Sequence, residues 1–290
     1  GDQFPAALWR GVFTSVSAFC NAGFALQSDS LIPYQGTPLI LHVVALLIIC
    51  GGLAPAACLA FPSWLAGRQV PLTMRLALGA TVVLLAVGML QFLVLEWEGI
   101  MTGLGIADKI HNAWFQSVTL RTAGFNSLDV SGVTAPVFLV MLGWMFIGGC
   151  PGGTAGGIKT TTVAVLVLTF WQSIAGREEV IVRNRRIPPG TVNRAITIVV
   201  SGLLLWFILV LMLAITQQIP VRDLIFEVTS ALGTVGLSTG ATARLDGIGK
   251  IIIMWAMFIG RIGPMTLFML LSEERSSRIS RCLDARITLT

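Results

Sequence analysis

Residues 226–237 read FEVTSALGTVGL, residues 115–125 read FQSVTLRTAGF, and residues 13–24 read FTSVSAFCNAGF. Each segment begins with Phe, continues for about three helical turns, and ends in a polar, a small, a glycine and an apolar residue. The copy at 115–125 is one residue shorter than the other two. Because the same residue types recur in the same order three times, these segments indicate an internal repeat.

The stretches between the repeated segments are apolar enough to cross a lipid bilayer. Only 11% of the 290 residues are charged and 55% are apolar, and the mean hydropathy is +0.84. A soluble domain carries about a quarter charged residues, and a spanning helix needs roughly 20 apolar residues. Several runs of that length in one chain favour spanning helices over the buried helices of a soluble protein.

The repeated segments are too short and too polar to span, so we expect re-entrant pore loops, which are tolerated where they are buried in protein or line water. The predicted fold class is an all-α membrane protein of repeated helix–pore-loop–helix units. The predicted units are residues 1–70, which lack a first helix (pore loop 13–24, helix 37–65), residues 71–176 (helix 76–95, pore loop 113–125, broken helix 135–171), residues 177–272 (helix 195–215, pore loop 224–237, helix 251–271), and a basic tail at 273–290.

Arginine clusters set the predicted orientation. The basic residues behind the net charge of +5 gather at residues 68–75, 177–194 and 275–286, and the positive-inside rule places such clusters in the cytoplasm. We therefore expect a multi-pass protein of the cytoplasmic membrane with a cytoplasmic tail, and not a partner of nucleic acid. The five cysteines lack metal-binding spacing and are interpreted as small buried residues.

The pore loops have the residue types that a cation filter needs. A dehydrated monovalent cation requires a ring of oxygens in place of its water, and potassium-channel filters supply backbone carbonyls for this purpose. Glycine permits the backbone angles of such a loop, and a short helix before each loop directs its partially negative C-terminal end toward the cavity. The alternative is that the three loops only pack the helices together.

A glycine-rich segment interrupts one apolar span. Residues 148–160 read GGCPGGTAGGIKT, and six glycines with a proline cannot sustain a helix. A phosphate-binding loop is excluded because that motif needs glycine directly before lysine, whereas Ile158 precedes Lys159. Broken helices near the bilayer midplane belong to transport pathways, so this segment is a candidate part of one.

Three ionisable residues fall within predicted membrane segments. A charge such as Arg261 is costly there and usually faces a cavity or a partner, and carbonyls of the glycine-rich segment are the expected acceptors. We hypothesise that Arg261 is an electrostatic barrier in the permeation path; the alternative is that it locks two helices together. Lys159 either reaches the cytoplasm or lines the pore. Glu227, early in its predicted pore helix, could complement the helix dipole, and it is expected to be structural and not an ion ligand.

These motifs together resemble the Trk/Ktr/HKT superfamily of potassium transporters, most closely the bacterial Ktr or Trk ion-conducting membrane subunit. The resemblance implies a single-chain pore of four repeats with pseudo-fourfold symmetry, in which the present loops are those of repeats two, three and four. The first repeat and the leading helix of the second are then expected to be missing from this chain. Two departures are Cys20, where Asn is usual, and Leu120, where Pro is common. The stretches that carry the resemblance are residues 17–24, 121–126, 148–162, 226–228, 233–238 and 260–264.

The resemblance also implies roles for individual residues and for partners. The transported ion would be potassium, with sodium as a further candidate, and no organic cofactor is expected. The family resemblance implies a homodimer in the lipid bilayer, carried on a cytoplasmic nucleotide-binding regulatory subunit. The implied filter carbonyls are those of Asn21, Ala22, Gly23, Thr122, Ala123, Gly124, Thr234, Val235 and Gly236, and the implied gating residues are Gly152, Gly153, Gly156, Gly157, Lys159 and Arg261.

Three other classes of membrane protein are weighed against a potassium pore. A carrier built on inverted repeats would not place three similar loops on one side of the membrane. A membrane enzyme is disfavoured because His42 and His111 have no acid, serine or metal-binding partners at useful spacing. A purely structural membrane subunit would not need the triplicated loop.

Overall fold

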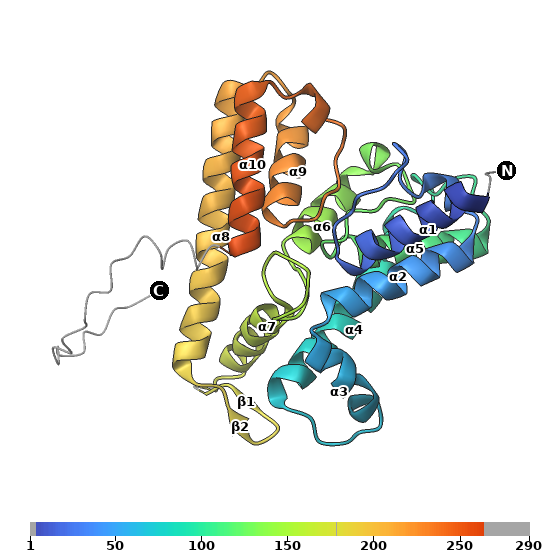
Figure 1. The fold of residues 1–290 in the computed structure, drawn as a ribbon. Coiled ribbons are helices and arrows are strands. Elements are labelled where there is room, and N and C mark those ends of the chain that lie inside the picture. Colours follow the sequence, from blue (N-terminus) through green and yellow to red (C-terminus); the bar gives the residue numbers. More distant parts are fainter. Residues whose placement is uncertain (1–3, 178, 264–290) are drawn as a thin grey trace.

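The computed structural model describes residues 4–177 and 179–263, which form short and long helices around a set of loops (Figure 1). A short hairpin of two-residue strands, β1 (Ile181–Val182) and β2 (Arg185–Arg186), lies at the lower end of the view. The helices are α1 (Phe4–Phe19), α2 (Pro38–Gly52), α3 (Pro55–Leu65), α4 (Leu72–Leu95), α5 (Ile106–Thr119), α6 (Ala135–Met145), α7 (Thr160–Ile174), α8 (Pro189–Thr216), α9 (Val221–Leu232) and α10 (Gly247–Ile262).

The three repeated segments each form the end of a short helix and the loop that follows it. Helix α1 packs on α2, α5 packs on α2 and α4, and α9 packs on α8 and α10. All three short helices begin earlier than the predicted pore loops at 13–24, 113–125 and 224–237. An acid in the first turn, Asp108 in α5 and Asp223 in α9, suits the positive end of the helix dipole.

The range 37–65, predicted as one helix, is two helices that meet at a bend of 108°. Leu53 and Ala54 adopt extended conformations between them. Pro55 opens α3, and proline both lacks the N–H that would continue a helix and favours an extended residue before it. The break leaves helix-end carbonyls free, and those of Gly51 and Gly52 accept hydrogen bonds from the glycine-rich segment, as described below.

Two helices, α4 and α8, are each long and apolar enough to cross a membrane, and the bent pair of α2 and α3 would make a third span. Helices α6 and α7 occupy the predicted range 135–171 and are separated by a non-helical stretch at 146–159. Helix α10 begins four residues before the predicted start at 251. Residues 264–271 of that predicted helix and the tail 273–290 lie outside the described residues.

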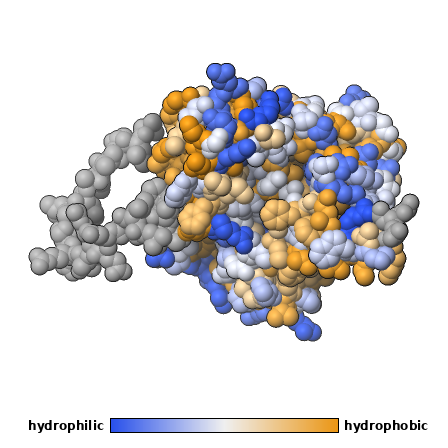
Figure 2. All heavy atoms as spheres, turned by 45° about the horizontal axis from the view of Figure 1, so that its top comes forward, coloured by the Kyte–Doolittle hydropathy of each residue, from blue (hydrophilic) through white to orange (hydrophobic). Residues whose placement is uncertain are grey.

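The long helices expose apolar side chains, and several polar side chains are buried among the apolar ones at the centre. Fully buried side chains at the centre include Phe115 and Phe226 of the short helices, but also polar residues such as Gln116 and Thr229. Large apolar side chains of the long helices face outward, and apolar residues (orange) cover much of the face in Figure 2. Lipid around the long helices would satisfy this pattern, since apolar surface is stable there and the polar centre is screened from it.

Gly51 is predicted to be required for the close packing of α2 against the end of α1, from which the first loop begins. A Cβ at Gly51 would overlap the backbone carbonyl of Phe19 at the end of α1. We expect Gly51→Ala to lower the stability of the protein in detergent by about 1–3 kcal/mol, the usual cost of overpacking, as measured by thermal unfolding. Gly79→Ala in α4 is the matched control, because nothing lies within 4 Å of its Cβ. Equal unfolding temperatures for both variants would contradict this prediction.

Candidate functional site

The three loops, far apart in sequence, meet at their glycines. A Cβ on Gly23 would lie 2.7 Å from the carbonyl oxygen of Ala123 and 2.9 Å from the Cα of Gly124. A Cβ on Gly124 would lie 2.5 Å from the carbonyl oxygen of Val235 and 3.3 Å from the Cα of Gly236. Side chains at these positions would therefore force the loops apart, so glycine is required by close backbone approach.

The loops also share one backbone conformation. In each, the first and third residues of the predicted filter triplet are left-handed, and the first is not glycine. Positive φ is uncommon for such residues and persists only where the surroundings enforce it, so its threefold recurrence indicates a functional loop. The φ values are 49°, 68° and 55° at Asn21, Thr122 and Thr234, and 71°, 81° and 90° at Gly23, Gly124 and Gly236.

The middle residue of each triplet is tied to the preceding short helix. Its backbone N–H donates to a carbonyl of that helix over 2.9 Å (Ala22 to Ser17), 3.0 Å (Ala123 to Thr119) and 2.8 Å (Val235 to Ser230). In a trans peptide the N–H and the preceding C=O point in opposite directions. The carbonyls of the first triplet residues therefore point away from their short helices, which leaves oxygens free to coordinate a cation.

The glycine-rich segment packs against two of these loops. A Cβ at Gly156 would overlap the side chain of Thr234, and a Cβ at Gly148 would lie 3.5 Å from the Cγ2 of Thr122. Gly152 and Gly157 have φ of +83° and +64°, which only glycine adopts freely. The segment can therefore approach the first filter residues closely because it lacks side chains there.

Helix α2 holds the glycine-rich segment by its broken end. The N–H of Cys150 donates to the carbonyl of Gly52 (2.9 Å), and the N–H of Thr154 donates to that of Gly51 (3.0 Å). A Cβ at Gly153 would overlap the carbonyl of Gly52. The break in the predicted 37–65 helix thus supplies the acceptors that fix the segment in place.

Three cationic side chains donate to carbonyls of the same segment. Arg261 Nη1 of α10 donates to the carbonyl of Thr154 (2.5 Å). This acceptor lies in the glycine-rich segment, where the sequence predicted the partner of Arg261. Lys159 Nζ turns back to the carbonyl of Ala155 (2.7 Å). Arg121 Nη2, buried beside the second filter triplet, reaches the carbonyl of Gly148 (3.3 Å).

Arg261 also borders a cavity of about 550 Å³ between the first and third loops. Ala22, Gly23 and Gly236 of the predicted filter triplets line this cavity, together with Glu227. The guanidinium group is therefore placed beside the loops as well as against the glycine-rich segment.

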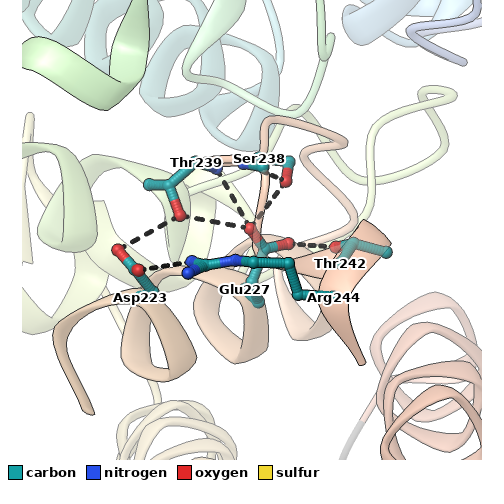
Figure 3. Close-up of polar contacts among 7 residues, drawn as sticks. Asp223, Glu227, Ser238, Thr239, Thr242 and Arg244 are labelled. Carbon is teal, nitrogen blue, oxygen red and sulfur yellow. Dashed lines mark hydrogen bonds and ion pairs between the residues drawn. The ribbon is translucent and has the colours of Figure 1, made fainter. Parts of the chain in front are cut away.

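Glu227 holds the loop that follows the third triplet (Figure 3). Its buried carboxylate accepts hydrogen bonds from Ser238 Oγ (2.6 Å), from the N–H of Thr239 (3.0 Å) and from Thr242 Oγ1. Arg244 pairs beside it with Asp223 over 2.7 Å. Glu227 is the seventh residue of α9, so it lies away from the helix N-terminus, and its structural role comes from its hydrogen bonds to the loop and not from the helix dipole.

Sequence reasoning overlooked two buried charged residues. Glu96 is fully buried, and its carboxylate accepts from the N–H of Thr134 (2.7 Å) and of Ile100 (3.0 Å), which fastens the start of α6 to the end of α4. Arg121 was quoted only as part of a motif. A charge adjoining an apolar run is the signal that could have singled out both, but their partners are distant in sequence.

Comparisons with known proteins agree with this geometry. Residues 4–280 match the family described as TrkH, cation transport protein. The chain belongs to the TrkH family. The predicted resemblance is thereby confirmed, and the relatives of this chain are ion transporters and not enzymes. TrkH family transporters are multi-pass proteins of the cell membrane, which agrees with the apolar helices of this chain.

Relatives and one solved structure cover nearly all of this chain. The Ktr system potassium uptake protein B of Bacillus subtilis is 37% identical over 276 residues, which are 94% of this chain and 62% of that protein. The potassium/sodium uptake protein NtpJ of Enterococcus hirae is 37% identical over 265 residues, which are 90% and 59%. The crystal structure of the potassium transporter TrkH from Vibrio parahaemolyticus matches with a TM-score of 0.76 at 20% identity, over 91% of this chain and 58% of that one. The TrkH fold and the predicted class of repeated membrane helices are thus confirmed, while the chain spans less than two thirds of these relatives.

Removal of the Glu227 carboxylate is predicted to loosen the third loop. We expect Glu227→Ala to lower stability by roughly 3 kcal/mol, because hydrogen bonds to a buried charged group are lost. Glu227→Gln should lose less, since one acceptor oxygen remains. Thermal unfolding in detergent measures both, with the exposed Glu98→Ala as the control. An unfolding temperature of Glu227→Ala equal to that of the control would disprove this role.

Proposed function

We propose that the protein containing this chain takes up potassium through a pore lined by backbone carbonyls. The observation that carries the proposal is the threefold recurrence of one loop geometry, with left-handed first and third residues and a middle amide that donates back to its own short helix. Such a loop presents backbone carbonyl oxygens, which suit a dehydrated monovalent cation. The carbonyls proposed to bind the ion belong to Asn21, Ala22, Gly23, Thr122, Ala123, Gly124, Thr234, Val235 and Gly236.

Relatives support potassium as the ion and leave sodium as a further candidate. The Bacillus subtilis protein is named for potassium uptake, and the Enterococcus hirae protein for potassium and sodium uptake. Both cations are monovalent and bind oxygen, so the same carbonyls would serve either one. We propose that residues 1–70, 71–176 and 177–272 are successive units of the pore, each contributing one loop.

We further propose that the glycine-rich segment gates the pore and that Arg261 controls it. The segment contacts the first residues of two filter triplets, and Arg261 holds it through the carbonyl of Thr154 while bordering the adjoining cavity. A cation repelled by the guanidinium group would face a barrier below the filter until this contact opens. The proposed gating residues are Gly152, Gly153, Gly156, Gly157, Lys159 and Arg261.

We propose that the protein forms a homodimer in the membrane and binds a nucleotide-binding regulatory subunit in the cytoplasm. The arginine-rich connection at 177–194, which forms the β1–β2 hairpin, is the proposed face for the regulatory subunit. Arg186 there pairs with Glu179 over 3.1 Å, yet both side chains remain about half exposed.

Potassium uptake in a potassium-auxotrophic host tests the proposed ion and filter together. The complete gene that contains this chain should restore growth at low potassium, and rubidium and sodium competition should rank the ions. Gly124→Ala should abolish uptake, because a Cβ would press on the carbonyl of Val235 and φ is +81°. Gly143→Ala in α6 is the control, since its Cβ meets nothing within 4 Å. Failure of the unmodified gene to restore growth would refute the proposed function.

Arg261→Ala is predicted to raise potassium flux several-fold by removing the charge and the anchor of the segment. Arg261→Lys keeps the charge and should stay close to the unmodified protein. The alternative role, a lock between helices, predicts a lower unfolding temperature and no gain of flux. Rubidium uptake per molecule of membrane-inserted protein measures the difference, and an unchanged flux in Arg261→Ala would exclude the barrier.

A further inference from the structure

A hydroxyl-bearing residue occupies the same place in each of the three short helices, four residues after the Phe that opens the repeat. These residues are Ser17, Thr119 and Ser230. All three are buried, with at most 5% of each residue exposed. They are not among the carbonyls predicted to bind the ion and belong to no filter triplet, so the function proposed above does not account for them.

Each of these hydroxyls donates to the backbone carbonyl of the residue directly after the filter triplet. The distances are 2.8 Å from Ser17 Oγ to Phe24, 2.5 Å from Thr119 Oγ1 to Phe125, and 2.6 Å from Ser230 Oγ to Leu237. The bond spans seven residues in the outer copies but six in the middle one. The deleted residue of the middle copy therefore lies between helix and filter, and the contact persists although the spacing differs.

The same three residues also hold the start of the filter triplet. Their backbone carbonyls accept from the N–H of the middle triplet residue, so Ser17, for example, binds Ala22 through its carbonyl and Phe24 through its hydroxyl. The first bond turns the carbonyl of Asn21 away from the short helix, whereas the second turns the carbonyl of Phe24 toward it. The carbonyl of the first triplet residue thus points away from the short helix, whereas the carbonyl of the residue after the triplet points toward it.

We propose that Ser17, Thr119 and Ser230 are positioning residues that end the row of ion-facing carbonyls at the glycine of each loop. By holding the next carbonyl on the short helix, the hydroxyl limits each loop to three carbonyls for the ion and fixes the peptide planes between two anchors. This role rests on the proposed carbonyl filter and deepens it, because it assigns the selectivity of the filter to groups that never touch the ion.

The ordinary alternative is a hydroxyl that only satisfies its own helix. Ser and Thr in helices commonly donate to the carbonyl four residues earlier, and two neighbours do so here, Ser15 to Gly11 and Thr229 to Ile225. The three positioning hydroxyls reach forward into the loop instead. Ser15 lies two residues before Ser17, and Thr229 directly precedes Ser230. Both therefore serve as controls on the same helices.

Thr119 offers the sharpest test because valine matches its shape without the hydroxyl. In the complete protein, Thr119→Val should reduce the preference for potassium over sodium by about twofold to tenfold, the range that one net hydrogen bond allows. Thr119→Ser keeps the hydroxyl and should restore the preference. Ser17→Ala should act as Thr119→Val does, whereas Ser15→Ala should leave the preference unchanged.

Thr229→Val separates ion preference from stability, since Thr229 is buried and also accepts from Trp206 Nε1 over 2.8 Å. This variant should lower the unfolding temperature without altering the ion preference. Normal uptake with an unchanged ratio in both Thr119→Val and Ser17→Ala would overturn the positioning role alone. The same holds if Thr119→Ser is as unselective as Thr119→Val. Absence of potassium uptake by the unmodified protein would overturn the proposed function, and the positioning role with it.

Discussion

The hydrogen bond from the middle triplet N–H to the carbonyl of its own short helix is the interaction on which the rest of the site depends. It occurs in all three loops at 2.8–3.0 Å. A short helix ends with unpaired carbonyls, and inside a membrane such groups need partners. The returning loop supplies one N–H for this purpose, and the trans peptide then directs a carbonyl the other way. Satisfying the helix end and exposing an oxygen are therefore a single structural event, repeated three times.

Glycine has two separable tasks in this architecture. In the predicted filter triplets, Gly23, Gly124 and Gly236 supply positive φ, and the first two also leave no room for a Cβ. In the glycine-rich segment the second task dominates, because Gly148, Gly149 and Gly153 lie against backbone carbonyls. The break between α2 and α3 and this segment complete each other, since the carbonyls freed by the break are the acceptors that the segment requires.

Charge is distributed so that Glu227, Arg121 and Arg261 bind neutral backbone or hydroxyl partners near the loops. Glu227 accepts from hydroxyls and an N–H (Figure 3), while Arg121 and Arg261 donate to carbonyls of the glycine-rich segment. Such partners stabilise a buried charge without neutralising it. The carboxylate of Glu227 and the guanidinium of Arg261 line the same cavity and therefore both contribute to its electrostatic field.

The sequence by itself determined the membrane class, the threefold repeat, the family and the position of the glycine-rich break, because these depend on composition and on local order. It also indicated that Arg261 would find its acceptor in that segment. Only the tertiary structure decided that range 37–65 bends by 108°, that Glu227 binds the loop and not the helix dipole, and which carbonyls receive Arg121 and Arg261. Ser17, Thr119 and Ser230 occupy one aligned position of the repeat in the sequence, but their hydrogen bonds to the loop carbonyls were visible only in the structure. The physical reason is that helix propensity and hydropathy report neighbours within a few residues, whereas the partner of Arg261 lies 107 residues away along the chain.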